Sequence, residues 1–358
     1  MRTPVAIITG FLGSGKTTLL NRLLQRPEMA GVAVIINEFG EIGLDHLLIA
    51  TPSENTVLLS SGCLCCTVRG DLVETLADLY RKRRDAAIPS FDRVIVETTG
   101  LADPVPILQT LVIDPELAPL FGLDSVVTLV DAVNGAQQLD QHPESVKQAA
   151  VADRLLLTKT DLASGEATAR LRERLARINP GARVSSPVQG AVDPGELFGA
   201  GVEDASATAV QRWLGEAQFA QAEAHHHEHD VNRHDDHIRA FCIYHNAPVS
   251  AAGLEMWLNM LAALRGARLL RVKGLLNVDG TPVAIHAVQT LIHEPVTLER
   301  WPDEDRRSRL VFITRDMSRE EIERTLPTLA LRPDAGRKST ALDPKAYAEF
   351  LEAAKTFR

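Results

Sequence analysis

Short apolar runs alternate with helical stretches over the first half of the chain. Six runs rich in Val, Ile and Leu are nearly continuous in apolar residues: 5–9, 32–36, 56–59, 93–97, 125–132 and 154–158. Continuous runs are typical of strands that are buried on both faces of a parallel sheet. Four helix candidates lie between the runs: 16–24, 71–83, 104–111 and 167–178. This order predicts an α/β fold with a doubly wound, mostly parallel sheet.

The pattern changes after residue 215. The stretch AEAHHHEHDVNRHDDH, which ends at His237, holds six of the eleven histidines and almost nothing apolar. Such a segment cannot bury enough surface to offset the entropy of ordering it, so we expect a flexible, His-rich linker over residues 216–237. Its imidazoles could capture Zn²⁺, Co²⁺ or Ni²⁺ loosely, and a plain polar spacer is the alternative.

A smaller α+β domain is expected over residues 238–358. Four runs resemble strands: 240–245, 268–274, 282–289 and 308–314. Residues 251–264 carry apolar side chains at helical spacing, and a second helix is expected over 318–326, where Ser318 and Glu321 form the pattern of a capping box. A last helix is expected to begin with Asp343 as its N-cap and Pro344 at its first position.

The strongest motif is GFLGSGKT at Gly10–Thr17, a full match to the G-x-x-x-x-G-K-[ST] pattern between a predicted strand and a predicted helix. The glycines let the backbone wrap a phosphate, and the amides of residues 13–18 can then point at the anion. We expect Lys16 to reach the β- and γ-phosphates and Thr17 to ligate Mg²⁺. The motif therefore predicts a P-loop NTPase domain over residues 1–215. Its expected phosphate-binding residues are Gly10, Gly13, Ser14, Gly15, Lys16, Thr17 and Thr18.

A second motif, TKTD at Thr158–Asp161, indicates which nucleotide is bound. A carboxylate at Asp161 can accept hydrogen bonds from N1–H and the 2-amino group of guanine, a donor pair that adenine lacks. The stem of Lys159 would lie along the base. The usual GTPase motif has Asn where this chain has Thr158, but the discriminating carboxylate is present. The motif favours GTP, and a solvated loop is the alternative.

Two further loops follow predicted strands: NEFGEIGLD at 37–45 and ETTGLADP at 97–104. Ligands of open α/β sheets bind at the carboxyl ends of strands, so both loops are expected to face the nucleotide. Glu97 occupies a Walker-B-like position, where it could hold Mg²⁺ or orient water, and the amide of Gly100 could reach the γ-phosphate. We therefore expect Lys16 and Glu97 to be catalytic. Thr98, Thr99 and Gly100 complete the expected nucleotide-binding set.

Three of the four cysteines crowd together as Cys63, Cys65 and Cys66 in SSGCLCCTVRGDL. Thiolates bind Zn²⁺ and other thiophilic metals, and this spacing offers two or three ligands without a second cysteine pair nearby. Glu41 or Glu38, a linker histidine or water would have to complete the shell, which suits a metal that must leave again. Buried apolar cysteines and a strained C-x-C disulfide are the alternatives.

Composition narrows the functional classes further. The 358 residues are 45% hydrophobic and 24% charged, which fits a globular chain with a sizeable core. A formal net charge of −9 and only 4% aromatic residues argue against nucleic acid or an anionic membrane as a partner. No apolar stretch approaches the roughly 18 residues that span a bilayer, and no secretory signal is visible. We expect a cytoplasmic protein, and we expect its remaining cysteine, Cys242, to be a small buried side chain.

These motifs together resemble the CobW-type metallochaperone GTPases, P-loop proteins related to the GTPases that insert nickel into urease and hydrogenase. The resemblance rests on GFLGSGKTTLLNRLL, NEFGEIGLD, GCLCC, ETTGLADP and TKTD in this order. Segments of the second half, such as LLRVKGLLNVDGTPVAIHAVQ and SRLVFITRDM, also resemble the C-terminal domain of that family. The resemblance therefore covers nearly the whole chain.

The resemblance implies a Mg²⁺-dependent, slow GTPase that binds Zn²⁺ or Co²⁺ and delivers it to a metal-requiring client protein. It implies that Gly13–Thr18 bind phosphates, that Lys159 and Asp161 bind guanine, and that the three clustered cysteines bind the cargo metal. Thr158 is a variant that the family tolerates. A cobalt chaperone of cobalamin synthesis and a passive metal buffer are the alternatives. The oligomeric state stays open, because a switch of this type can form a homodimer with GTP or metal.

Overall fold

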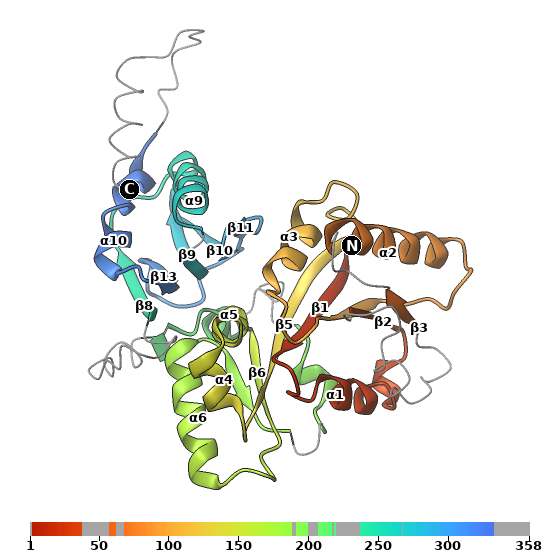
Figure 1. Ribbon diagram of the computed structural model, residues 1–358. Helices are drawn as coiled ribbons and strands as arrows, with labels where there is room; N and C mark the ends of the chain where they lie inside the picture. Colours follow the sequence, from red (N-terminus) through yellow and green to blue (C-terminus); the bar gives the residue numbers. More distant parts are fainter. Residues whose placement is uncertain are drawn as a thin grey trace. The chain divides into compact units, whose positions relative to one another are not determined.

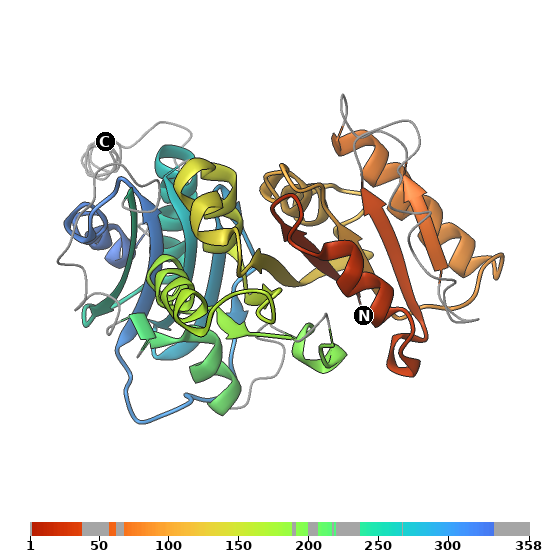
Figure 2. The same cartoon turned by 60° about the horizontal axis from the view of Figure 1, so that its bottom comes forward.

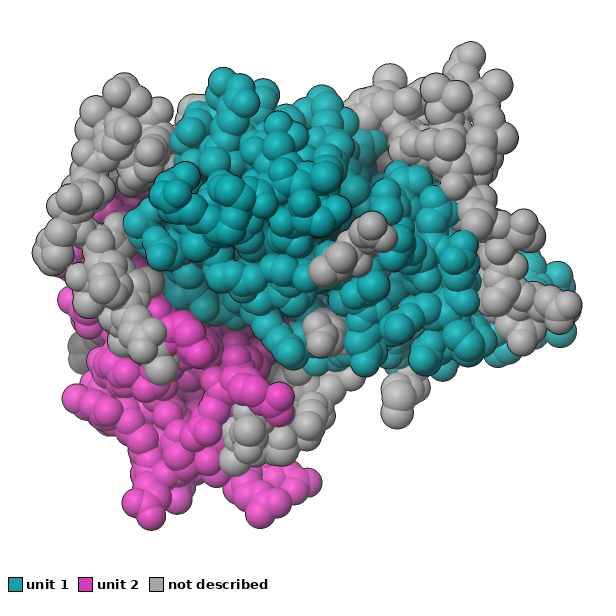
Figure 3. Space-filling model, turned by 90° about the horizontal axis from the view of Figure 1, so that it is seen from below, with its two compact units in different colours: residues 1–203, 231–235 teal, residues 204–230, 236–358 magenta. Residues whose placement is uncertain are grey.

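The structure is a computed structural model that describes residues 2–37, 57–61, 68–187, 191–199, 207–216, 218–219, 237–266 and 268–332. It divides into two compact units, which Figure 3 colours separately. Unit 1 is Met1–Glu203 with Val231–Asp235, and unit 2 is Asp204–Asp230 with Asp236–Arg358. Helix α7 (Ala207–Leu214) falls in unit 2, whereas the predicted boundary at residue 215 leaves it in the first domain. It is held there partly by the Lys273 ammonium, which donates a hydrogen bond of 3.0 Å to the Trp213 carbonyl.

In its described part, unit 1 is built on a sheet of seven parallel strands in the order β3-β2-β4-β1-β5-β6-β7 (Figure 1). The strands are β1 (Thr3–Gly10), β2 (Val32–Asn37), β3 (Val57–Ser61), β4 (Arg93–Glu97), β5 (Phe121–Asp131), β6 (Arg154–Thr158) and β7 (Arg183–Ser185). The first six correspond to the six predicted runs. The last strand was not predicted, because its three residues are exposed or only partly buried and show no apolar run. The doubly wound α/β prediction is confirmed.

Helices cover both faces of this sheet. They are α1 (Lys16–Leu23), α2 (Val68–Arg84), α3 (Val105–Ile113), α4 (Gly135–Gln141), α5 (Pro143–Val151) and α6 (Gly165–Ile178). Helix α1 lies on one face, where Leu19, Leu20 and Leu23 are buried, and α2 and α3 lie on the other (Figures 1 and 2). Helices α4 and α5 were not predicted, because their sequence is polar, is interrupted by Pro143, and buries mainly small residues such as Ala149 and Ala150.

Unit 2 contains an antiparallel sheet whose described strands follow the order β11-β10-β9-β13-β8, with β12 paired to β10. The strands are β8 (Ile238–His245), β9 (Leu269–Val278), β10 (Thr281–Val288), β11 (Leu291–Ile292), β12 (Val296–Thr297) and β13 (Ser308–Arg315). Helix α9 (Ala251–Arg265) packs on this sheet, with Trp257 edge-on to Phe312 in the core. The predicted α+β domain is therefore confirmed.

Two predicted details of unit 2 are also present. Helix α10 (Arg319–Glu323) begins with the expected capping box between Ser318 and Glu321. Cys242 is buried in strand β8, as predicted. The helix expected from Asp343 lies outside the described residues. Of the helices that the structure describes, none has both the length and the apolar character needed to cross a bilayer.

Candidate functional site

The carboxyl ends of four neighbouring strands bring the predicted motifs of unit 1 together. Strands β4, β1, β5 and β6 lie side by side and parallel, so the loops that follow them leave the sheet at one edge. These loops contain the P-loop after β1, the ETTGLADP segment around the end of β4, and the TKTD segment at the end of β6. The sheet edge is where ligands of open α/β folds bind.

The P-loop has backbone angles that favour glycine. Gly10, Gly13 and Gly15 have φ values of 142°, 73° and 94°. At Gly10 a side chain is also excluded by space, because a Cβ atom would lie 2.4 Å from the Leu129 carbonyl oxygen. Gly15 is the N-cap of helix α1, so the first amides of that helix follow the loop directly. An anion placed there would face backbone donors and the positive end of the helix.

Lys16 folds back over the loop. Its ammonium donates hydrogen bonds to the Gly10 carbonyl at 2.8 Å and to the Phe11 carbonyl at 3.4 Å. Lys16 is buried, whereas Thr17 is partly exposed and Thr18 is exposed. The charge of Lys16 is thus held within the P-loop, where a bound phosphate would meet it.

The end of strand β4 places a buried carboxylate beside this loop. Glu97 is only 5% exposed and lies opposite Ile8 of β1 in the strand register. The next residue, Thr98, extends the pairing, since its amide donates to the Ile8 carbonyl at 2.9 Å and its hydroxyl donates to Thr9 Oγ1 at 2.8 Å. The hydroxyl of Thr99 is buried and has no hydrogen-bond partner among the described residues. A buried acid and an unsatisfied hydroxyl at this edge fit Mg²⁺ or its bound water.

Gly100 packs directly against the P-loop. A Cβ atom at Gly100 would lie 2.6 Å from the Leu12 amide nitrogen and 2.8 Å from its Cα atom, so only glycine fits. The loop that contains Thr98 and Thr99 is therefore held next to the P-loop by backbone contact. Sequence reasoning expected this glycine to approach the γ-phosphate, and the structure places it beside the phosphate loop.

The TKTD segment is joined to the P-loop by its first residue. The Thr158 hydroxyl donates a hydrogen bond of 2.7 Å to the Ser14 carbonyl. Lys159 has a φ of 55°, an unusual value for a non-glycine residue, and its ammonium lies 2.7 Å from Asp131 Oδ2. Asp161 is exposed, so its carboxylate is accessible to a base.

Asp131 is a residue that the motif search missed. It is buried at the end of β5 and accepts hydrogen bonds from Lys159, from the Asn134 side chain and from the amides of Val133 and Asn134. Burial by itself would raise the pKa of Asp131, but the hydrogen bonds from Lys159, Asn134 and Val133 outweigh it and lower this pKa. Asp131 therefore stays ionised and fixes the side chain of Lys159.

The predicted cargo-metal ligands Cys63, Cys65, Cys66, Glu38 and Glu41 lie outside the described residues. The strands that lead to them are described. Asn37 and Ser61, the last residues of β2 and β3, are register partners, and Ile36 is the register partner of Glu97. Strands β2 and β3 therefore end at adjacent points of the sheet, and the end of β2 lies next to Glu97, with β3 one strand further away. Among the described residues, no group of three His, Cys, Asp or Glu side chains could hold a metal ion.

Family models match both units. The model of the CobW/HypB/UreG nucleotide-binding domain matches residues 4–186, and that of the cobalamin synthesis protein CobW C-terminal domain matches residues 238–330. The chain belongs to the CobW/HypB/UreG family. The family predicted from the motifs is therefore confirmed.

Curated relatives and a solved structure cover nearly the whole chain. The zinc chaperone YjiA of Escherichia coli is 36% identical over 89% of this chain and 96% of its own length. The zinc chaperone CobW of Pseudomonas aeruginosa is 30% identical over 91% of each chain. The crystal structure of Zn(II)-bound YjiA GTPase from E. coli aligns with a TM-score of 0.69 and 31% identity over 92% of this chain and 100% of that chain.

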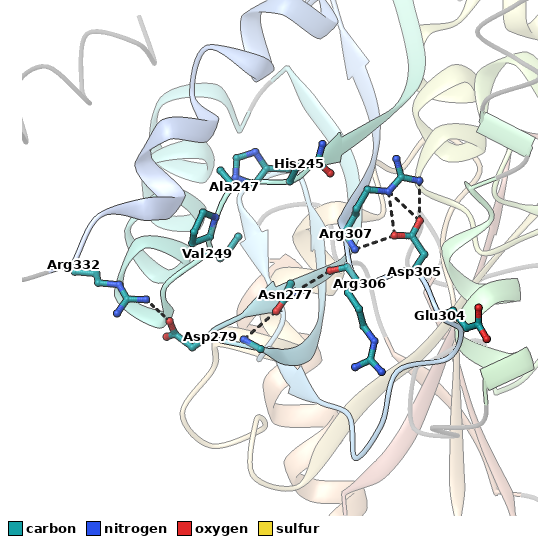
Figure 4. A pocket seen from close by; sticks show the side chains of 13 residues that line it. His245, Ala247, Val249, Asn277, Asp279, Glu304, Asp305, Arg306, Arg307 and Arg332 are labelled. Atoms are coloured by element: carbon teal, nitrogen blue, oxygen red, sulfur yellow. Dashed lines mark hydrogen bonds and ion pairs between the residues drawn. The ribbon is translucent and has the colours of Figure 1, made fainter.

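The CobW C-terminal domain contains a separate pocket with a volume of about 620 Å³. Figure 4 shows two ion pairs at its sides, Arg307 with Asp305 and Arg332 with Asp279. His245 lines the same pocket, and burial lowers the pKa of this histidine, which favours a neutral imidazole. The walls combine charged side chains, most of them paired, with apolar residues such as Pro248 and Val249, so the pocket suits a segment that has both polar and apolar side chains.

Proposed function

We propose that this chain is a GTP-hydrolysing metallochaperone that binds Zn²⁺ through Cys63, Cys65 and Cys66 and transfers it to a client protein. The proposal is carried by the position of β2 and β3. Their ends are register neighbours of each other, and the end of β2 lies beside Glu97, so the NEFGE segment begins next to the nucleotide site and the GCLCC segment follows the strand one position further along the sheet. The names of the relatives YjiA and CobW, both zinc chaperones, support Zn²⁺ as the cargo.

GTP is the proposed nucleotide. Asp161 would accept hydrogen bonds from guanine, while Lys159, held by Asp131 at 2.7 Å, would lie along the base. The test is to compare GTP, ATP and XTP as substrates of the wild-type protein and of Asp161→Asn. We expect the wild type to prefer GTP by at least about tenfold and the variant to shift toward XTP. A wild type that hydrolyses ATP as well as GTP would contradict this assignment.

Thr17 and Glu97 would hold Mg²⁺ in this proposal. The buried carboxylate of Glu97 and the hydroxyl of Thr17 are oxygen ligands of the kind that Mg²⁺ prefers. The ion would neutralise charge on the β- and γ-phosphates. Lys16 would bind the same phosphates, and the amides of Gly13–Thr18 and Gly100 would donate hydrogen bonds to the phosphate oxygens. Glu97 would orient the attacking water at the buried end of strand β4.

Nucleotide and cargo metal would be coupled through the loops around Glu97. GTP would draw the segments after β2 and β4 inward, which brings Glu38 or Glu41 near the three thiolates and tightens Zn²⁺ binding. Hydrolysis would release these segments and open the metal shell. Linkage then requires that Zn²⁺ tighten GTP binding by the same factor. A passive buffer would bind metal without regard to nucleotide, so Lys16→Ala would leave its metal affinity unchanged.

The loops at the carboxyl edge also suggest where a second copy could bind. Leu12 is 54% exposed, Leu101 50%, Val133 49% and Leu162 72%, and each follows one of four neighbouring strands around the nucleotide site. Large exposed apolar side chains clustered around a site are typical of an interaction surface. We propose a nucleotide-dependent homodimer contact here and a client-binding site at the pocket of the CobW C-terminal domain. The proposed compartment is the cytoplasm, where clustered thiols stay reduced.

A further inference from the structure

Helix α5 holds the ETTGLADP loop through one buried glutamine. Gln148 is 1% exposed, and its side-chain amide donates hydrogen bonds to the Gly100 carbonyl at 3.2 Å and to the Ala102 carbonyl at 3.0 Å. Its own backbone carbonyl accepts a bond of 2.8 Å from the Thr128 hydroxyl on strand β5. Gln148 lies in none of the nucleotide-binding motifs of the sequence.

The orientation of this amide is fixed by its partners. A rotated amide would direct its oxygen at two carbonyl oxygens, so the nitrogen must face the loop. The oxygen of Gln148 is buried and has no hydrogen-bond partner among the described residues. Gln148 thus contributes two donated hydrogen bonds to the loop.

A second contact from the same helix reaches the next part of the loop. The Lys147 ammonium lies 3.3 Å from Asp103 Oδ2, with side chains that are 29% and 31% exposed. A partly exposed pair of this kind contributes little to stability. The buried bonds from Gln148 are therefore the main restraint that α5 places on Gly100 and Ala102.

The restraint acts on the residue that faces the P-loop. Gly100 has no room for a side chain where it faces Leu12, and its carbonyl accepts a hydrogen bond from Gln148. It is therefore fixed between the P-loop and helix α5. Without such a restraint a glycine would be the most mobile point of the loop. We infer that Gln148 is a positioning residue of the GTPase, which holds Gly100 so that its amide meets the γ-phosphate. This inference rests on the proposed function as a GTPase.

The test compares Gln148→Glu and Gln148→Met with the wild-type protein. Glutamate keeps the size of the side chain, but at this buried position beside two carbonyl oxygens it is expected to be protonated and to donate one bond in place of two, whereas methionine keeps the shape and removes the polar group. For both variants we expect kcat for GTP hydrolysis to fall about tenfold or more, because one restraining bond is lost in Gln148→Glu and both are lost in Gln148→Met. The Kd for GDP should stay within about twofold, whereas KM for GTP should rise together with the Kd for the GTP analogue. The preference for a non-hydrolysable GTP analogue over GDP should fall about tenfold, since only the γ-phosphate contact depends on Gly100.

Two controls separate positioning from folding. Gln141→Met removes an exposed glutamine from the neighbouring helix α4 and should change neither rate nor affinity. Thermal unfolding of each variant shows whether the native fold is kept, and Gln148→Glu is the second variant if Gln148→Met unfolds. A Gln148 variant that weakens GDP and the GTP analogue equally, or that leaves kcat unchanged, would overturn the inference.

Failure of the proposed function would be seen separately. A wild-type protein without GTP hydrolysis would refute the proposed function. The role of Gln148 would then be decided by the two affinities alone, because selection of the γ-phosphate does not require hydrolysis. An unchanged ratio of the two affinities in Gln148→Glu would refute the role of Gln148.

Discussion

The Thr158 hydroxyl donates a hydrogen bond of 2.7 Å to the backbone carbonyl of Ser14, which ties the TKTD segment to the P-loop. Thr158 also lies close enough to Val130 to donate to its carbonyl at 3.3 Å. The residue that departs from the usual GTPase motif therefore joins the two halves of the candidate nucleotide site. A threonine can do this because one hydroxyl donor suffices for a carbonyl acceptor.

Thr158→Val should loosen this connection without changing the shape of the side chain. The variant leaves the Ser14 carbonyl without its buried donor, which should cost about 1–3 kcal/mol of unfolding free energy. We expect GTP and GDP to bind about five- to thirtyfold more weakly, because both the phosphate loop and the base segment depend on the bond. Isothermal titration with each nucleotide and a chemical denaturation curve measure the two effects. Thr158→Ser, which keeps the hydroxyl, should bind both nucleotides nearly as the wild type does.

Gly100→Ala should displace the ETTGLADP loop from the P-loop. Its Cβ atom would lie 2.6 Å from the Leu12 amide, so backbone has to move. We expect GTP hydrolysis to fall at least about tenfold while GDP affinity changes little, because GDP lacks the γ-phosphate that Gly100 would meet. Gly165→Ala is the matched control, since its Cβ atom would meet nothing within 4 Å. Equal activity of the Gly100 and Gly165 variants in a phosphate-release assay would contradict the assigned contact.

The Asp131–Lys159 pair predicts a defined response to acid. Because the pKa of Asp131 is lowered in the folded protein, its stabilisation is complete above the ordinary carboxyl pKa of 3.8 and is lost as the pH falls through the lowered value. Asp131→Asn should therefore be less stable by about 1–3 kcal/mol at neutral pH. The difference in Tm between the two proteins should shrink on acidification below pH 4. A constant difference from pH 7 to pH 3 would show that Asp131 has no lowered pKa.

Leu162→Gln tests the exposed apolar edge. Leu162 is 72% exposed, so the substitution should change the unfolding free energy by no more than about 0.5 kcal/mol. If the second copy binds there, the variant should weaken the dimer formed with a GTP analogue, as measured by sedimentation equilibrium. Ile113→Gln is the control, because Ile113 is similarly exposed at 57% but ends helix α3 rather than a loop of the nucleotide site. Equal loss of dimer in both variants would count against this surface.

The apolar pattern predicted most of the fold. Continuous runs such as 93–97 are buried on both faces of a sheet, and the glycines of the P-loop have the backbone angles that their motif implies. Helices α4 and α5 escaped prediction because they bury alanines and a glutamine rather than a stripe of large apolar side chains. Their packing depends on the tertiary structure.

Of the residues of the candidate site, only those that lie in a sequence motif could be predicted. Lys16, Glu97 and Asp161 lie in motifs with fixed spacing. Asp131 and Gln148 act on residues 28 and 48 positions away, through contacts that chain folding alone creates. The aspartate after the run SVVTLV and the glutamine in a polar helix carry no spacing signal of their own. A buried polar residue that follows a buried strand is the one feature that could have pointed to Asp131.

If the bound nucleotide controls the cysteine site, the Zn²⁺ affinity of the protein must differ between its two nucleotide states. Zn²⁺ is titrated into the full-length protein with Mg²⁺ and either a non-hydrolysable GTP analogue or GDP, and Co²⁺ is titrated in parallel. Cys65→Ser should lose binding in both states, whereas Cys242→Ala, a change in the buried strand β8, should bind as the wild type does. We expect Zn²⁺ to bind at least about tenfold more tightly with the GTP analogue than with GDP. Equal affinity with the analogue and with GDP would contradict it.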